Sequence, residues 1–144
     1  MRGVAAIVGV LAVMAGPAAA ATDGTYTQGN TKTGAGVRMT VGNGTFAIRI
    51  VRFRETCHYG DRDFTEFFTF KAGSRAHLAG KVQADGTFRG TYTPNGNTVV
   101  ATGRVDAQTA TIKVTEHGSY DPASTTHPNA CRGSKTFVAK LSGR

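Results

Sequence analysis

The chain has 144 residues, in which 17 Lys and Arg outweigh 9 Asp and Glu to give a formal net charge of +8. Frequent glycine and the absence of tryptophan argue against a helical protein and favour short strands joined by tight turns. The two cysteines are too few for the usual zinc domains, and the basic residues recur singly rather than in runs.

The first 21 residues have the order of a secretory signal peptide. A basic start at Arg2 precedes an apolar run, and small residues follow up to Ala20 and Ala21. The apolar run has about 12 residues, whereas a membrane-spanning helix needs about 20, and no other stretch is long enough to span a membrane. We therefore expect residues 1–21 to be cleaved off after Ala20 or Ala21, and residues 22–144 to form one secreted domain.

Alternating apolar residues predict the first strands of the mature chain. Residues 22–33 are polar apart from one tyrosine and read as either a short edge strand or a loose lead-in. Val37, Met39 and Val41 alternate with polar residues, which predicts a strand with one buried face. Residues 42–44, Gly-Asn-Gly, are typical of a hairpin turn.

The stretch from Thr45 to Phe70 is predicted to be the central hairpin, because it holds most of the phenylalanines. Its alternation changes phase at residues 50–51, which predicts a β-bulge and places Glu55 on the inward side. After a polar turn at residues 58–63, Phe67 is expected on one face of the second strand, so that this strand is central or partly covered. The other face is expected to carry Phe64, Glu66, Phe68 and Phe70.

Further strands with period-2 alternation complete the chain. They are expected at 77–83, 88–92, 99–105, 110–114 and 135–141. A polar loop of about 13 residues, 118–130, precedes the last strand and is long for a compact domain. The fold class predicted is all-β: an antiparallel up-and-down meander closed as a small barrel of about 8 strands, with a two-sheet sandwich as the alternative.

Two cysteines in an exported chain predict one disulfide, Cys57–Cys131, with two free thiols as the alternative. The bond would close a loop of about 75 residues and stabilise the fold by about 4 kcal/mol. In a strict meander, however, the number of intervening strands places the two cysteines at opposite ends of the barrel. Either the loop at 118–130 crosses the length of the barrel or residues 71–83 form no ordinary strand. We expect the crossing, because it also explains the length of the loop.

Histidine and carboxylate side chains raise the possibility of a metal site. The candidates are His58, Glu116, His117, Asp121 and His127. Their spacing matches no ligand motif, and surface loops commonly carry such residues. We therefore predict neither a metal site nor a cofactor site.

Carboxylates near the turn at residues 58–63 raise the possibility of glycoside hydrolysis, because Glu55 and Glu66 lie close to it in sequence. No Gly-x-Ser-x-Gly nucleophile motif is present. We predict no catalytic residues and a non-enzymatic protein. The alternative is a small secreted hydrolase, which requires at least two side chains of one set to converge within about 5 to 9 Å. That set is His58, Asp61, Glu66, His117 and His127.

The candidate basic surface consists of Arg49, Arg52 and Arg54, with Arg38 and Lys71 on neighbouring strands. The change of phase means that Arg49 need not face the same way as the other two arginines of this strand. An exported basic domain favours an anionic envelope polymer or a glycan as partner. Nucleic acid is not expected, because few exposed aromatics are available for base stacking. Scattered, solvated charge is the alternative interpretation.

Three segments, GTFRGTY at 86–92, VVATGRV at 99–105 and ATIKV at 110–114, accompany the export signal and the Cys57/Cys131 pair. With these features the chain resembles small exported bacterial all-β proteins of unassigned function. It is more distantly similar to avidin-type and lipocalin-type barrels, which hold small ligands. The resemblance implies no substrate and no site. The export signal and the absence of an assembled catalytic set favour a binding or envelope-associated module, with a barrel for a small apolar ligand as a further alternative.

Overall fold

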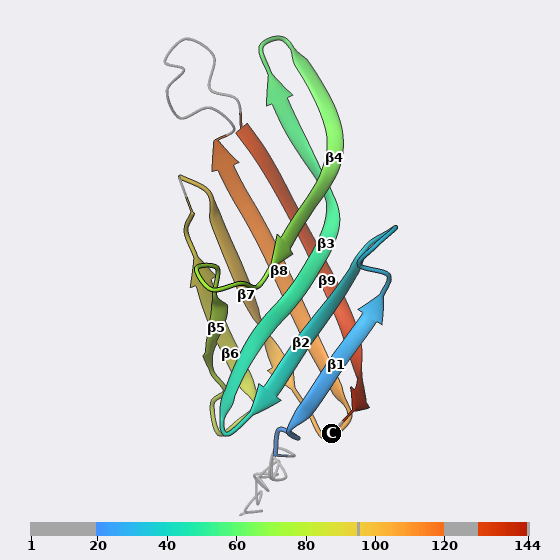
Figure 1. The fold of residues 1–144 in the computed structure, drawn as a ribbon, viewed down its shortest axis with the longest axis vertical. Coiled ribbons are helices and arrows are strands. Elements are labelled where there is room, and N and C mark those ends of the chain that lie inside the picture. The colour runs from blue at the N-terminus through green and yellow to red at the C-terminus, as the bar shows by residue number, and fades with distance from the viewer. Residues whose placement is uncertain (1–19, 95, 120–129, 144) are drawn as a thin grey trace, which may run out of the picture.

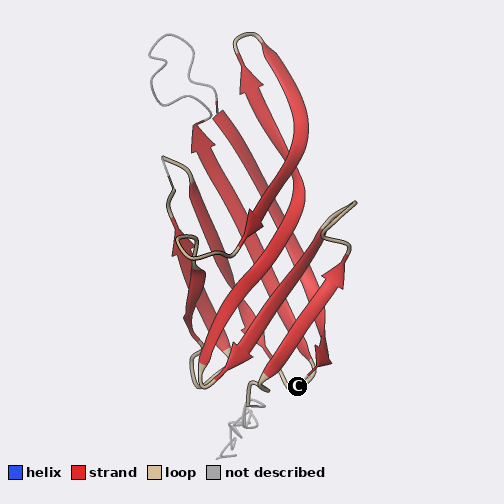
Figure 2. Cartoon of the chain, in the orientation of Figure 1, coloured by secondary structure: helices blue, strands red, loops and turns tan. Residues whose placement is uncertain are grey.

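The computed structural model describes residues 20–94, 96–119 and 130–143. These residues form nine strands and no helix (Figures 1 and 2). The strands are β1 (Gly24–Gly29), β2 (Gly36–Gly42), β3 (Thr45–Tyr59), β4 (Arg62–Lys71), β5 (Leu78–Lys81), β6 (Thr87–Tyr92), β7 (Thr98–Val105), β8 (Thr109–Ser119) and β9 (Ala130–Gly143). None of the described residues forms a helix long and apolar enough to cross a membrane.

All the strand pairs are antiparallel, and the sheet has the order β4-β3-β2-β1-β9-β8-β7-β6, with β5 paired to β3. This arrangement confirms the predicted all-β antiparallel meander. Between β5 and β6 the pairing is a single isolated bridge, Val82 to Phe88, rather than a ladder. The pairings therefore establish a nine-stranded meander. They do not establish a closed barrel, and a two-sheet sandwich is equally compatible with them.

Residues 22–33 contain a short strand, β1, as one of the two alternatives predicted, but β1 is an inner strand and not an edge strand. It pairs with β2 on one side and with the end of β9 on the other. Tyr26 is fully buried, and its hydroxyl donates to the carbonyl oxygen of Thr22 at 2.7 Å. One large side chain is enough to anchor β1 to the core, because alternate side chains of a strand with neighbours on both sides point into the core.

The bulge predicted in β3 is present. Ile48 pairs with Met39 and Ile50 pairs with Arg38, which leaves Arg49 as the extra residue of β3. Ile48 before the bulge and Val51 after it are both buried. The extra residue thus keeps the apolar side chains of this long strand on the inner face, while Arg49 and Ile50 lie outside.

The core is filled by aromatic and branched side chains from strands on both sides of it. In Figure 1, β2 and β3 cross in front of β8 and β9, and the core lies between these layers. The buried residues are Tyr26, Val37, Met39, Val41, Phe46, Ile48, Val51, Phe53, Phe70, Leu78, Phe88, Val99, Ala101, Val105, Ala110, Ile112, Val114, Phe137 and Ala139. Burial of each large side chain stabilises the fold by about 1.5–3 kcal/mol.

The predicted disulfide is present and joins direct cross-strand partners of β3 and β9. Cys57 and Cys131 have their Cα atoms 4.0 Å apart. The expectation that the loop at 118–130 crosses the molecule was wrong, because β8 and β9 are neighbours that pair up to Ser119 and Ala130. Residues 120–129 lie outside the described part of the chain.

The second explanation is also wrong as stated, because residues 71–83 include strand β5, and the direction of that strand resolves the difficulty instead. Strand β4 pairs with the later half of β3, and β5 pairs with its first residues, on the same edge. Both are antiparallel to β3, so the chain does not reverse direction between β4 and β5. Residues 71–83 therefore add no reversal, and the two cysteines meet at one end of the sheet.

Candidate functional site

A groove of about 540 Å³ lies on the outer side of the sheet, where β2, β3 and β4 adjoin the turn that follows β1. Its charged and titratable side chains are all basic: Lys32, Arg38, Arg49, Lys71 and His77. None of the described residues that line it is acidic. We call this the basic groove.

Strand register assembles the basic groove. Arg38 of β2 and Lys71 of β4 are both cross-strand partners of Ile50, so their side chains stand on the same face. The bulge adds Arg49, whose Nε donates to Thr40 Oγ1 at 3.1 Å. The backbone nitrogen of Ala72 donates to the Arg49 carbonyl at 2.9 Å, which holds the loop after β4 against the bulge.

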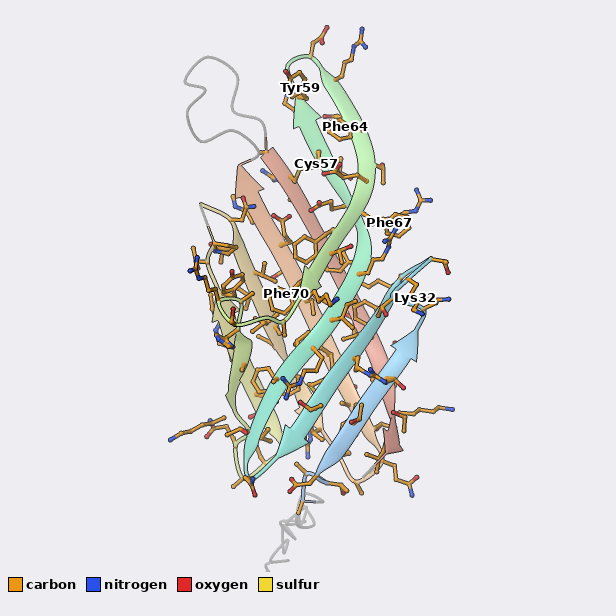
Figure 3. All side chains as sticks on the ribbon, viewed as in Figure 1. Lys32, Cys57, Tyr59, Phe64, Phe67 and Phe70 are labelled. Carbon is orange, nitrogen blue, oxygen red and sulfur yellow. A yellow bond between two sulfur atoms is a disulfide. The ribbon has the colours of Figure 1, made fainter. Side chains whose placement is uncertain are left out.

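The three arginines of the predicted basic surface all lie on the outer side of β3, but they fall into two groups. Arg49 lines the basic groove. Arg52 and Arg54 stack over Phe67, with their guanidinium carbons 4.2 and 5.1 Å from the ring centroid. Figure 3 shows that Phe67 and Phe70 point to opposite sides of β4. Phe67 thus lies on the face opposite Phe70, as predicted. Strand β4 is an edge strand rather than a central one, and the two arginines cover this face.

On the inner side of β3, all three glutamates of the sequence line one small cavity of about 130 Å³, together with Asn97. Glu55 of β3 and Glu66 of β4 are cross-strand partners. Glu116 comes from β8. Glu55 is 7% exposed and Glu116 is 4% exposed. We call this cavity the acidic pocket.

Two glycines leave the space in which these side chains meet. A Cβ atom at Gly133 of β9 would lie 2.8 Å from the Cβ of Glu55 and 2.7 Å from a ring carbon of Phe53. A Cβ atom at Gly118 would collide with Asn97 and lie 2.8 Å from Glu116 Oε1. Any larger residue at either position would displace a wall of the acidic pocket.

The acidic pocket is rich in hydrogen-bond acceptors. Glu55 Oε2, Glu116 Oε2 and Asn97 Oδ1 are buried without a hydrogen-bond partner. Burial away from water raises the pKa of Glu116 to about 8, and a hydrogen bond with Glu55 and repulsion from Glu55 and Glu66 add to the effect. Burial also raises the pKa of Glu55. No lysine, arginine or histidine is among the described residues that line the pocket.

The disulfide forms one wall of the acidic pocket. Glu66 Oε1 lies 3.3 Å from the Cys57 sulfur and 3.9 Å from the Cys131 sulfur. Together with Glu55, these groups place two carboxylates and two sulfurs within 4.8 Å of one another. The sulfurs are bonded to each other and are not thiolates, so the donors available are oxygen atoms.

The residues considered for a metal site do not gather as a set among the described positions. Glu116 is buried in the acidic pocket, whereas His117 is exposed. His58 contacts Asp63 at 2.7 Å, with both side chains largely exposed. Asp121 and His127 lie outside the described residues.

The residues considered for a hydrolase are also dispersed where they are described. Only Glu66 of that set lines the acidic pocket. Asp61 is 97% exposed at the tip of the hairpin. Sequence reasoning placed Glu55 inward but missed its meeting with Glu116. A signal was available, because the inward phase of Ala110, Ile112 and Val114 continues to Glu116.

Comparisons with protein-family models, with curated proteins and with solved structures found no match. Two sites of opposite charge on the two sides of β3 therefore stand as the candidate functional sites: the basic groove outside and the acidic pocket inside.

Proposed function

We propose that the protein is an exported, non-enzymatic binding module that holds an anionic polymer or glycan in its basic groove. The observation that carries this proposal is the gathering of five basic side chains around one groove whose described lining contains no carboxylate. Such a cluster repels itself, and an anionic ligand relieves that repulsion while it gains attraction from every charge.

The size and chemistry of the groove suit such a ligand. Its volume of about 540 Å³ falls within the range of about 300–1,000 Å³ that is common for ligand sites. Guanidinium groups bind carboxylate, sulfate or phosphate with paired hydrogen bonds, and lysine adds point charge. Arg52 and Arg54 continue the positive surface along β3, which favours an extended ligand over a small ion.

The exported state rests on the signal peptide predicted at residues 1–21, of which only Ala20 and Ala21 are described. The disulfide is consistent with an extracytoplasmic location. Mass spectrometry of protein recovered outside the cytoplasm should find a chain that begins at Ala21 or Thr22. An intact Met1 would contradict export by cleavage.

The rival functions receive less support from the geometry. The acidic pocket, about 130 Å³, is smaller than the common range for ligand sites and fits an ion or a few waters better than a sugar. An apolar ligand would have to displace the aromatic side chains that fill the interior. Nucleic acid is not favoured, because no Phe, Tyr or Trp is among the described residues that line the basic groove.

Binding to anionic polymers tests the proposal. The mature protein should bind dextran sulfate or polyglutamate at low salt, release them as salt rises, and ignore neutral dextran. Replacing three groove charges, in the variant Arg38→Gln/Arg49→Gln/Lys71→Gln, should weaken binding by about tenfold or more, at about 0.5 kcal/mol per charge.

A matched control removes the same number of charges elsewhere. The variant Lys113→Gln/Lys135→Gln/Lys140→Gln changes exposed lysines of β8 and β9 and should retain most of the binding. Equal losses in the two triple variants would show that net charge alone drives binding. Absence of binding at low salt would remove the proposal.

A further inference from the structure

We propose that the acidic pocket is a binding site for a divalent cation that prefers oxygen ligands, with Ca²⁺ as the best fit. Its ligands would be Glu55, Glu66, Glu116 and the side-chain oxygen of Asn97. The site lies on the inner side of β3, away from the basic groove, so it does not depend on the function proposed for that groove.

Unpartnered buried acceptors point to a cation. Glu55 and Glu116 are each more than nine-tenths buried, and each has a carboxylate oxygen without a partner. Asn97 adds a third such oxygen in the same pocket. A buried acceptor without a donor is costly, and the described lining offers no side-chain cation to satisfy these three. One bound metal ion would satisfy all three together.

The donor count matches Ca²⁺. Three carboxylates and one amide offer up to about seven oxygens, and Ca²⁺ takes about 6–8 at about 2.3–2.6 Å in flexible geometry. Mg²⁺ demands a near-ideal octahedron and keeps several of its waters, which a cavity of about 130 Å³ accommodates poorly. Zn²⁺ prefers thiolate and imidazole, and the two sulfurs here are joined in the disulfide.

The fold holds the three carboxylates on strands, whereas Asn97 lies in the β6–β7 connection directly before Thr98. Glu55 and Glu66 are fixed by the β3–β4 register, and Glu116 lies opposite Gly133 in the β8–β9 register. Because Gly133 and Gly118 carry no side chain, the carboxylates approach one another without steric interference. A bound cation would therefore connect the edge strand β4 to β8 and stabilise the folded state.

Calorimetry and thermal unfolding of the mature, disulfide-intact protein test the site after treatment with a chelator. Ca²⁺ should bind with a stoichiometry of about one per chain and raise Tm by about 5 °C at saturation. Mg²⁺ should have a smaller effect. The isosteric variants Glu55→Gln and Glu116→Gln should weaken Ca²⁺ binding by at least about tenfold.

A second measurement separates loss of a ligand from loss of the fold. Glu116→Gln replaces a buried carboxyl, whose charged form is disfavoured there, with a neutral group of the same shape. Its Tm without metal should therefore equal or exceed that of the unchanged protein, while its response to Ca²⁺ disappears. Asp63→Asn is the matched control, because Asp63 is exposed and outside the pocket, and it should respond to Ca²⁺ like the unchanged protein.

Two outcomes would overturn the proposal: absence of saturable binding of Ca²⁺ to the unchanged protein, and binding that survives in both glutamine variants.

Discussion

Strand β3 carries charges of opposite sign on its two sides, and they lie in different surroundings. On the outer side, Arg49 lines an open groove, where water and salt weaken its repulsion from neighbouring cations. On the inner side, Glu55 is buried against Glu66 and Glu116, where repulsion is strong. A cluster of like charges at the surface is compatible with a stable fold in the absence of ligand, because solvent screens the repulsion. A buried cluster needs a bound proton or cation to neutralise part of its charge.

The largest expected effect comes from the wall of the acidic pocket. Replacing both cysteines, in Cys57→Ser/Cys131→Ser, should lower the free energy of unfolding by about 4 kcal/mol, because the disulfide closes a long loop of the unfolded chain. Denaturant titration measures this change. An unfolding midpoint that is the same with and without reductant would contradict a structural role for the disulfide.

The free energy of unfolding of the metal-free protein should depend on pH through Glu116 in the acidic pocket. The pKa of Glu116 is about 8 in the folded state and 4.5 ordinarily, so the folded state binds more protons between these values. The free energy of unfolding should therefore fall as pH rises through this window, by up to about 1.4 kcal/mol per pH unit, and level off above it. Denaturant titrations across this range should show a flatter dependence for Glu116→Gln; an equal slope in both proteins would assign the effect to other groups.

The glycine that admits Glu55 to the pocket should tolerate no side chain. Gly133→Ala brings a Cβ atom to 2.7 Å from Phe53 and 2.8 Å from Glu55, and should cost about 1–3 kcal/mol of stability. Thermal unfolding provides the measurement. Gly143→Ala is the control on the same strand, because nothing lies within 4 Å of its added Cβ, and it should leave Tm nearly unchanged.

A substitution on the outer side of the β3–β4 hairpin should give the smallest change in stability. Phe67→Ala removes the ring beneath Arg52 and Arg54, and should lower the free energy of unfolding by about 1 kcal/mol through loss of two cation–π contacts. Chemical denaturation can resolve this difference. Phe64→Ala, at an exposed position of the same strand, should change stability less. If the two variants lose equal stability, the arginine contacts contribute nothing measurable.

Local patterns in the sequence were sufficient for much of the fold. Alternation predicted most strands, the phase change at residues 50–51 predicted the bulge in β3, and the cysteine pair predicted the disulfide. These features depend on residues close in sequence or on the chemistry of one residue type, so they can be read without knowing the topology. The same is true of Phe67, whose place on the face opposite Phe68 and Phe70 follows from the period of two in β4.

Relations between distant strands could not be read in this way. The inner position of β1 depends on β9, more than one hundred residues later, and the shared direction of β4 and β5 depends on their common partner β3. For β1, pairing with strands on both sides outweighs the polar character of its sequence, so that even a strand with one large residue lies within the sheet. The wrong expectation for the loop at 118–130 followed from the assumption that every strand reverses the chain.

The sequence by itself determined the strand periodicity and the inward direction of Glu55, and it singled out Arg49, Arg52 and Arg54 as candidates for a basic surface. Only the tertiary structure decided that Glu55 meets Glu66 and Glu116 beside a disulfide, and that Arg49 joins a groove while its two neighbours cover Phe67. The physical reason is that alternation specifies which side of a strand a residue occupies, whereas register and strand order specify which residues it meets there.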